Sequence, residues 1–243
     1  MRLDKLLSNT GYGTRKEVRQ LLKKGMIRVN GAVIKDPALH VDPAKDTITL
    51  LGEDVVYKEF VYLMMHKPPG VISATEDKYD RTVIDLLGSE ERHFQPFPVG
   101  RLDKDTEGLL LLTNDGQLAH HLLSPKKEVP KIYFAKVSGQ VTEEDVNEFA
   151  KGVILDDGYE TKPGDLKILQ SGDVSEIELT ITEGKFHQVK RMFESVGKKV
   201  VYLKRLTMGP LILDKQLKLG EYRELTDEEL SELQKLDSTK QKG

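Results

Sequence analysis

The sequence predicts an α+β fold divided between a small N-terminal domain and a larger second domain. The chain has 243 residues, enough for two separate hydrophobic cores. Residues 1–35 contain nine Lys or Arg and two acids, a net charge of +7, and the overall charge of −3 therefore leaves −10 for the rest. Beyond residue 60, segments that alternate apolar and polar residues predict strands, and apolar residues at helical spacing predict helices.

The first 35 residues predict two short helices and a hairpin. Three leucines between residues 3 and 7 form the apolar stripe of the first helix. Thr14 and Glu17 have the spacing of a capping box, which begins a second helix that Gly25 ends. Asn30-Gly31, between two short strands, is typical of a tight hairpin turn.

Basic side chains gather on this first domain. On the second helix Val18, Leu21 and Leu22 face inward, so the basic residues face outward. Most charge runs are simply solvated helix faces, but here few acids accompany the charges, and this favours RNA binding. The residues that we predict to contact RNA in this domain are Arg2, Lys5, Arg15, Lys16, Arg19, Lys23, Lys24 and Arg28.

The chain is predicted to divide into three parts. A closing strand at residues 47–51 and a linker from residue 52 complete the first domain, so that domain and linker span residues 1–58. The second domain covers residues 59–236, and residues 237–243 are expected to form a disordered tail.

A loop in the second domain places acids directly before a hydrophobic strand. Asp103, Asp105 and Glu107 precede four leucines at 109–112, and Asn-Asp-Gly at 114–116 predicts a turn after a strand buried on both faces. A rigid strand can hold a carboxylate in one geometry, so we place the chemistry here.

Two simpler interpretations of these acids compete. The acids and Gly108 match four positions of an EF-hand calcium loop, but the twelfth position is Asn114 instead of a bidentate glutamate, which disfavours calcium. The other interpretation is a solvated acidic loop that caps a structural strand, and periodicity alone favours it. Other segments have to decide between this interpretation and a catalytic role.

The remaining pattern predicts more strands and two helices. Residues 131–137 alternate apolar and polar residues, so Tyr133 is by default a half-buried packing residue. A helix over 186–196 would bury Phe186, Val189, Phe193 and Val196, and it places Lys190 at the edge of that face. Such a lysine could extend its head into a pocket, although a snorkelling surface lysine fits the spacing equally well. The other predicted strands are 60–65, 175–182, 199–206 and 211–213, and the last helix is 226–236.

The loop acids resemble a motif of a known enzyme family. Residues 100–109, Gly-Arg-Leu-Asp-Lys-Asp-Thr-Glu-Gly-Leu, are similar to the second motif of the pseudouridine synthases, in particular of their RsuA branch. The resemblance implies that Asp103 is the catalytic residue and that Arg101 contacts RNA. The Lys-Pro-Pro-Gly turn at residues 67–70, whose plain interpretation is scaffold, is similar to the first motif of the family.

Two later segments carry the same resemblance. Residues 131–135 match the family pattern Lys-x-Tyr-x-Ala, which implies that Tyr133 contacts the target base. Residues 187–191, His-Gln-Val-Lys-Arg, resemble the third motif, in which a basic residue pairs with the catalytic aspartate. Spacing and resemblance agree on Lys190, which would keep that carboxylate ionised. Arg191 is the reserve candidate and is otherwise expected to point toward solvent or an RNA phosphate.

The N-terminal segment resembles the S4 RNA-binding domain, through Arg-Leu-Asp-x-x-Leu from Arg2 and Val-Asn-Gly at 29–31. Together the resemblances imply an S4-like α/β domain joined to a catalytic α+β domain with a large, mostly antiparallel mixed sheet and flanking helices. They imply that a uridine of small-subunit (16S) ribosomal RNA, at the helix 18 site, is isomerised to pseudouridine. The enzyme is expected to act as a monomer and to need no cofactor.

Three rival functions stay open. An S4 protein that assists ribosome assembly would bind ribosomal RNA without modifying it, but such a role does not explain the three motifs of the second domain. A sibling synthase would act on large-subunit (23S) ribosomal RNA. A glycosidase that uses Asp103 and Asp105 is disfavoured, because two acids two residues apart cannot readily flank one bond from opposite sides.

Composition argues against several other kinds of site. The chain has no cysteine, so it has no disulfide framework and no thiolate zinc site, which fits a reducing compartment. Its six histidines are not clustered at ligand spacing, and we predict no metal. We find neither an apolar stretch of membrane-spanning length nor an N-terminal signal region, and we expect a soluble, cytoplasmic protein.

Overall fold

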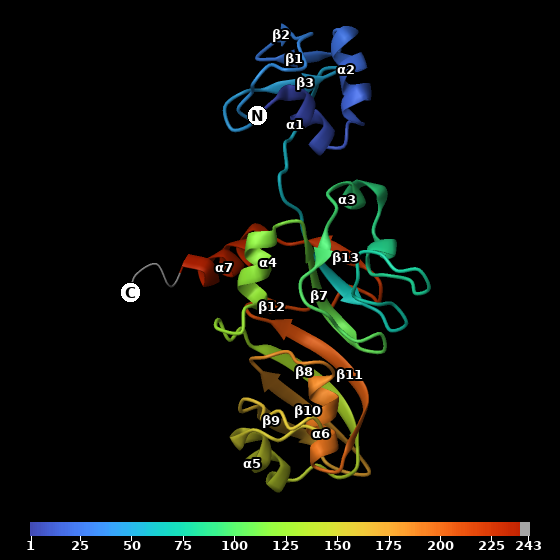
Figure 1. The fold of residues 1–243 in the computed structure, drawn as a ribbon, viewed down its shortest axis with the longest axis vertical. Helices are drawn as coiled ribbons and strands as arrows, with labels where there is room; N and C mark the ends of the chain where they lie inside the picture. The colour runs from blue at the N-terminus through green and yellow to red at the C-terminus, as the bar shows by residue number, and fades with distance from the viewer. Residues whose placement is uncertain (239–243) are drawn as a thin grey trace. The chain divides into compact units, whose positions relative to one another are not determined.

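The computed structural model describes residues 1–238, which divide into two compact units (Figure 1). The first unit comprises residues 1–61 together with residues 88–95, a segment that contains the short helix α3 (Ser89–His93). His93 Nε2 of that segment lies 2.6 Å from the carbonyl oxygen of Ser8. The second unit comprises residues 62–87 and the chain from residue 96 onward. No helix in the described part of the chain is long and apolar enough to cross a membrane.

The first unit packs two helices beside a small antiparallel sheet. The capping box is confirmed, since Glu17 Oε2 accepts from Thr14 N at 2.7 Å and Thr14 Oγ1 accepts from Glu17 N at 3.3 Å. Asn30 and Gly31 have φ of +52° and +82°, the left-handed backbone that a tight hairpin turn requires. The elements are α1 (Leu3–Asn9), α2 (Arg15–Lys23), β1 (Ile27–Val29), β2 (Ala32–Val33), β3 (Ile48–Leu50) and β4 (Glu53–Asp54), with sheet order β2-β1-β3-β4.

The prediction of a linker from residue 52 is wrong for its first residues. Glu53–Asp54 forms strand β4 against β3, and Val55 is buried in the core of the first unit. The sequence pattern missed this strand because it has only two residues, both acidic and exposed.

The second unit is built on one large mixed sheet, as predicted. Within the described residues this sheet has nine strands and a main order of β13-β5-β7-β11-β8-β10-β9. Every pairing is antiparallel except that of β7 with β11. The strands are β5 (Tyr62–Lys67), β6 (Phe97–Pro98), β7 (Glu107–Thr113), β8 (Lys131–Ser138), β9 (Asp165–Gln170), β10 (Val174–Ile181), β11 (Lys199–Met208), β12 (Leu211–Ile212) and β13 (Tyr222–Glu224).

Helices pack against the two halves of this sheet (Figure 1). Leu118 and Leu233, from α4 and α7, share a core with Leu109 and Leu111 of β7. In the other half, α5 and α6 meet through Phe149 and Phe193, whose ring centroids are 4.9 Å apart. The helices are α4 (Gly116–Leu123), α5 (Glu143–Lys151), α6 (Gln188–Ser195) and α7 (Asp227–Ser238), with a 3-10 turn at Ile84–Leu86.

Three element predictions need correction. Helix α6 begins at Gln188, so Phe186 lies before it and is exposed instead of buried. The predicted turn at 114–116 is the start of α4, where Asp115 Oδ1 accepts from the backbone N–H of Leu118 at 3.0 Å. Helix α7 extends to Ser238, so the first two residues of the predicted tail are helical, and residues 239–243 lie outside the described residues.

The parallel pairing of β7 with β11 depends on a glycine. Gly108 has φ of +113°, and a Cβ built on it would lie 2.2 Å from the carbonyl oxygen of Arg205. Any larger residue would force these two strands apart. Because β7 follows the loop at residues 100–106 directly, this close approach also brings the loop near β11 and its neighbour β8.

The buried lysine at the end of β5 fixes the position of that loop. Lys67 Nζ donates hydrogen bonds to the carbonyl oxygens of Asp103 at 3.0 Å and Thr106 at 2.9 Å, and the side chain is fully buried. Burial lowers the pKa of Lys67 from 10.5 to about 8, although the neighbouring Asp103 and Asp105 oppose this shift. Ser73 Oγ adds a further contact, accepting from the backbone N–H of Leu102 at 3.0 Å.

Lys67→Met should destabilise the protein by about 2–4 kcal/mol, because it leaves buried carbonyl oxygens without donors. The difference should depend on pH. The folded wild type releases the Lys67 proton near pH 8 whereas the unfolded chain holds it to about 10.5, so wild-type stability should rise relative to the variant between these values. Urea unfolding across this pH range measures both effects. Lys151→Met, at an exposed position, is the control, and parallel stability curves for wild type and Lys67→Met would contradict the prediction.

Candidate active site

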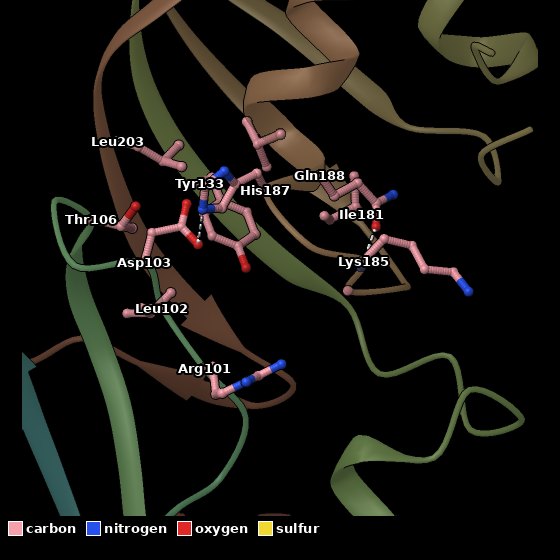
Figure 2. Close-up of a pocket in the computed structure, with 12 residues that line it drawn as sticks. Arg101, Leu102, Asp103, Thr106, Tyr133, Ile181, Lys185, His187, Gln188 and Leu203 are labelled. Atoms are coloured by element: carbon pink, nitrogen blue, oxygen red, sulfur yellow. Dashed lines mark hydrogen bonds and ion pairs between the residues drawn. The ribbon is translucent and has the colours of Figure 1, made fainter. Parts of the chain in front are cut away.

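Asp103 lies at the centre of a cluster of charged side chains contributed by two distant parts of the chain. Its Oδ2 is 3.0 Å from Lys190 Nζ on α6. Its Oδ1 is 3.6 Å from His187 Nε2, a contact that Figure 2 shows. Lys190 Nζ also contacts Asp105 Oδ1 at 2.6 Å. The lysine therefore joins both acids of the loop, and its position at the edge of the helix face agrees with the sequence pattern.

The two acids differ in their surroundings. The side chain of Asp103 is 23 % exposed, whereas that of Asp105 is 73 % exposed. Burial alone would lower the pKa of Lys190, but hydrogen bonds to Asp105 and Asp103 outweigh it and raise that pKa above the ordinary lysine value. Burial would raise the pKa of Asp105, and the hydrogen bond from Lys190 instead lowers it. Asp103 is thus the shielded carboxylate, and the cation beside it remains charged at neutral pH.

A small cavity of about 70 Å³ opens beside the Asp103 carboxylate. Tyr133, buried on β8, lies next to Asp103 in this cavity, and the apolar side chains of Ile181 and Leu203 complete its wall (Figure 2). The cavity therefore offers a carboxylate, an aromatic face and apolar surface. Such a site can hold a flat ring while a carboxylate attacks, or removes a proton from, the group attached to it.

The other predicted residues of this domain take different positions. Arg101 lines the cavity from the loop, and in Figure 2 its guanidinium points away from Asp103. Arg191 does not reach solvent as predicted, because its side chain is 13 % exposed and its guanidinium contacts Asp156 and Asp157, the latter at 2.7 Å. Between the two candidate partners of Asp103, the observed contact is made by Lys190.

The predicted RNA-binding residues of the first unit are mostly exposed. Arg2 and Arg19 differ, because both contact Asp4 Oδ2, at 2.9 Å and 3.3 Å, and the Asp4 side chain is fully buried. These two arginines therefore neutralise a buried acid in addition to facing outward. The spacing of the sequence did not indicate this contact with Asp4. The exposed members of the set are Lys5, Arg15, Lys16, Arg19, Lys23, Lys24 and Arg28, and Arg2 is half-buried.

Sequence reasoning missed several side chains that shape the site. His187, to which the sequence pattern gave no role, has its Nε2 3.6 Å from Asp103 Oδ1, and its φ of +49° places it directly before α6. Gln188 is buried and joins Glu183, with Nε2 to Oε1 at 2.6 Å, which fixes the turn at Gly184-Lys185. The sequence did offer a signal for Gln188. It is a polar residue in the segment that forms the buried face of α6, and a buried polar side chain needs a hydrogen-bond partner.

Within residues 1–238, no group of three or more His, Asp or Glu side chains is arranged to hold a metal ion. The site itself offers a carboxylate, a lysine ammonium, an imidazole and a phenol.

Comparison with known proteins shows the family to which the chain belongs. Residues 61–195 match the family described as RNA pseudouridylate synthase, and residues 1–48 match the S4 domain. The chain is 58 % identical to the uncharacterized RNA pseudouridine synthase YtzG of Bacillus subtilis, covering 95 % of this chain and 97 % of that protein. A solved pseudouridylate synthase has a TM-score of 0.67 at 35 % identity and covers 97 % of this chain and 99 % of its own.

Two further relatives are each 40 % identical over 97 % of this chain. They are the ribosomal small subunit pseudouridine synthase A of Vibrio cholerae, matched over its whole length, and the ribosomal large subunit pseudouridine synthase B of Bacillus subtilis, matched over 96 %. The chain belongs to the RNA pseudouridine synthase family, and it carries an S4 domain at its N-terminus.

Proposed function

We propose that this RNA pseudouridine synthase acts on small-subunit (16S) ribosomal RNA, at the helix 18 site, with Asp103 as its catalytic residue. The observation that carries the catalytic assignment is the contact of Asp103 with Lys190 beside a cavity lined by Tyr133. The choice of RNA rests on the resemblance to the RsuA pattern, including Thr161-Lys162-Pro163 and His187-Gln188-Val189-Lys190-Arg191, and on similarity to a small-subunit synthase.

The conversion of uridine to pseudouridine determines which chemical groups the site must supply. The bond from uracil N1 to ribose C1′ breaks, a bond from uracil C5 to the same carbon forms, and the C5 proton is lost while N1 gains one. The atoms balance without a second substrate. Asp103 serves as nucleophile or base on the ribose side, the Lys190 ammonium 3.0 Å away holds that carboxylate in place, and Tyr133 holds the detached ring. The apolar walls keep water from capturing the intermediate.

In this proposal the first domain supplies affinity for RNA. Its exposed lysines and arginines would contact phosphates, which carry affinity but little sequence information. Arg101, which lines the cavity, would contact the RNA close to the target uridine. The enzyme would act as a monomer in the cytoplasm, where bacterial ribosomal RNA is assembled.

A second candidate is the same reaction on large-subunit (23S) ribosomal RNA. The observation in its favour is that the large-subunit synthase B of Bacillus subtilis is as similar to this chain as the small-subunit enzyme of Vibrio cholerae. Target choice depends on RNA shape and on contacts outside the three motifs, so the shared catalytic residues do not separate the two.

Pseudouridine mapping on purified transcripts tests the proposal. The protein is incubated with unmodified 16S and 23S transcripts, naked and as assembly particles, and pseudouridines are located by carbodiimide labelling and primer extension. We expect one new pseudouridine in helix 18 of the 16S RNA and none in the 23S RNA. A product only in the 23S RNA would favour the second candidate. RNA binding with no product in any sample would favour an assembly factor.

Asp103→Asn should reduce pseudouridine formation by at least about 10²–10⁴-fold, the usual contribution of a catalytic acid or base, while RNA binding stays close to wild type. Asp105→Asn is the matched control in the same loop. Because Asp105 is largely exposed, its ion pair with Lys190 contributes little, and activity should stay within about tenfold of wild type. Similar losses in the two variants would contradict the assignment of Asp103.

Lys190→Met keeps the aliphatic stem and removes the charge. The acid limb of the pH–rate profile should move to higher pH, because the cation that favours ionised carboxylates in this pocket is gone. In the wild type the raised pKa of Lys190 means that its charge is lost only above the ordinary lysine range, so Lys190 should cause no decline near neutral pH. Arg191→Met is the neighbouring control, and a wild-type profile for Lys190→Met beside an inactive Arg191→Met would assign the pairing to Arg191.

A further inference from the structure

Phe186 is an aromatic residue that the fold leaves in solvent. Its side chain is 72 % exposed, although it stands in the turn between β10 and α6 that leads directly to the site. The ring stacks on that of His187, with centroids 3.7 Å apart and planes inclined by 19°. An exposed phenylalanine adds little to the hydrophobic core, so packing does not explain why this ring stands here.

The position of this stacked pair relates it to the reaction. His187 Nε2 lies 3.6 Å from Asp103 Oδ1 (Figure 2). The stacked pair therefore has one ring beside the proposed catalytic carboxylate and the other, Phe186, exposed to solvent. Phe186 and His187 line a cleft of about 660 Å³, and Asp103 lines it as well. The cleft is much larger than the 70 Å³ cavity beside Asp103, and it has room for more than the target uracil.

The charges around the cleft suit a nucleic acid strand. Arg101, Lys104 and Lys185 all line it. Lys104 also reaches Asp80 at 2.6 Å, and Lys185 Nζ lies 4.3 Å from the centre of the Tyr159 ring. A flat aromatic face among cations is the arrangement with which proteins bind single-stranded RNA, since bases stack on the ring and phosphates meet the cations.

We propose that Phe186, supported by His187, is the stacking platform for the base next to the target uridine. The inference rests on the proposed reaction at Asp103. A uridine that enters the cavity leaves its stack, so a neighbouring base loses a partner, and the Phe186 ring replaces that partner at the mouth of the site. The ligand of this subsite is thus one base of a single-stranded RNA segment.

Substitutions at Phe186 separate stacking from general apolar contact. Phe186→Ala removes the face and Phe186→Leu keeps an apolar side chain without it, so both should raise KM for RNA by about 5- to 150-fold, the usual contribution of one stacked base. Phe186→Tyr keeps the face and should remain close to wild type. Ile212→Ala, at a position 67 % exposed on β12, is the matched control for loss of an exposed apolar side chain.

A fluorescent base gives a readout that a purely structural role would not change. With 2-aminopurine beside the target uridine, in whichever rRNA the wild type converts, binding should quench the fluorescence at one neighbouring position, and Phe186→Ala should abolish that quenching. A KM for Phe186→Leu equal to wild type, or quenching that survives Phe186→Ala, would overturn the inference. If the wild type converts neither RNA, the proposed function is wrong. The stacking role of Phe186 is then tested by the same comparison of wild type and Phe186→Ala, with 2-aminopurine beside the central uridine of a single-stranded oligonucleotide.

Discussion

The buried ammonium group of Lys67 is the interaction on which the site depends. Asp103 lies in a loop without regular structure, and the backbone carbonyl oxygens of this loop converge on one donor at the end of β5. Burial of a charge is unfavourable unless hydrogen bonds compensate for it, so the loop cannot move away without leaving the ammonium unsatisfied. These hydrogen bonds therefore tie the loop that carries Asp103 to the end of β5.

Lys190, which contacts the Asp103 carboxylate, comes from α6, a distant part of the chain. The turn before α6 is fixed by Glu183 and Gln188, which are both buried and hydrogen-bonded to each other. Because that turn is rigid, α6 begins at a set point and presents Lys190 to Asp103 and Asp105. The acid and the cation are thus positioned by separate buried polar contacts, one on each side of the cavity.

Periodicity predicted most of the longer strands and the edge position of Lys190, but it missed β9 and the short strands β4, β6 and β13. It did not reveal that His187 contacts Asp103, since a left-handed backbone at a non-glycine residue is decided by tertiary packing and not by local preference. The role of Lys67 was hidden for a similar reason: a lysine at the end of a strand is usually at the surface. Arg191 was misplaced because its partners, Asp156 and Asp157, are remote in the sequence.

The net charge of this protein does not indicate the charge of the site. Residues 36–243 sum to −10, yet cations surround the proposed catalytic acid. Arg205 is buried on β11, and Lys131 is buried on β8, where burial lowers its pKa to about 8 and Arg205 adds to the shift. In the sheet Arg205 is the register partner of Tyr133, and Lys131 is two residues away on the same face. This domain therefore buries two cations beside Tyr133, where a detached uracil would carry negative charge, although its net charge is negative.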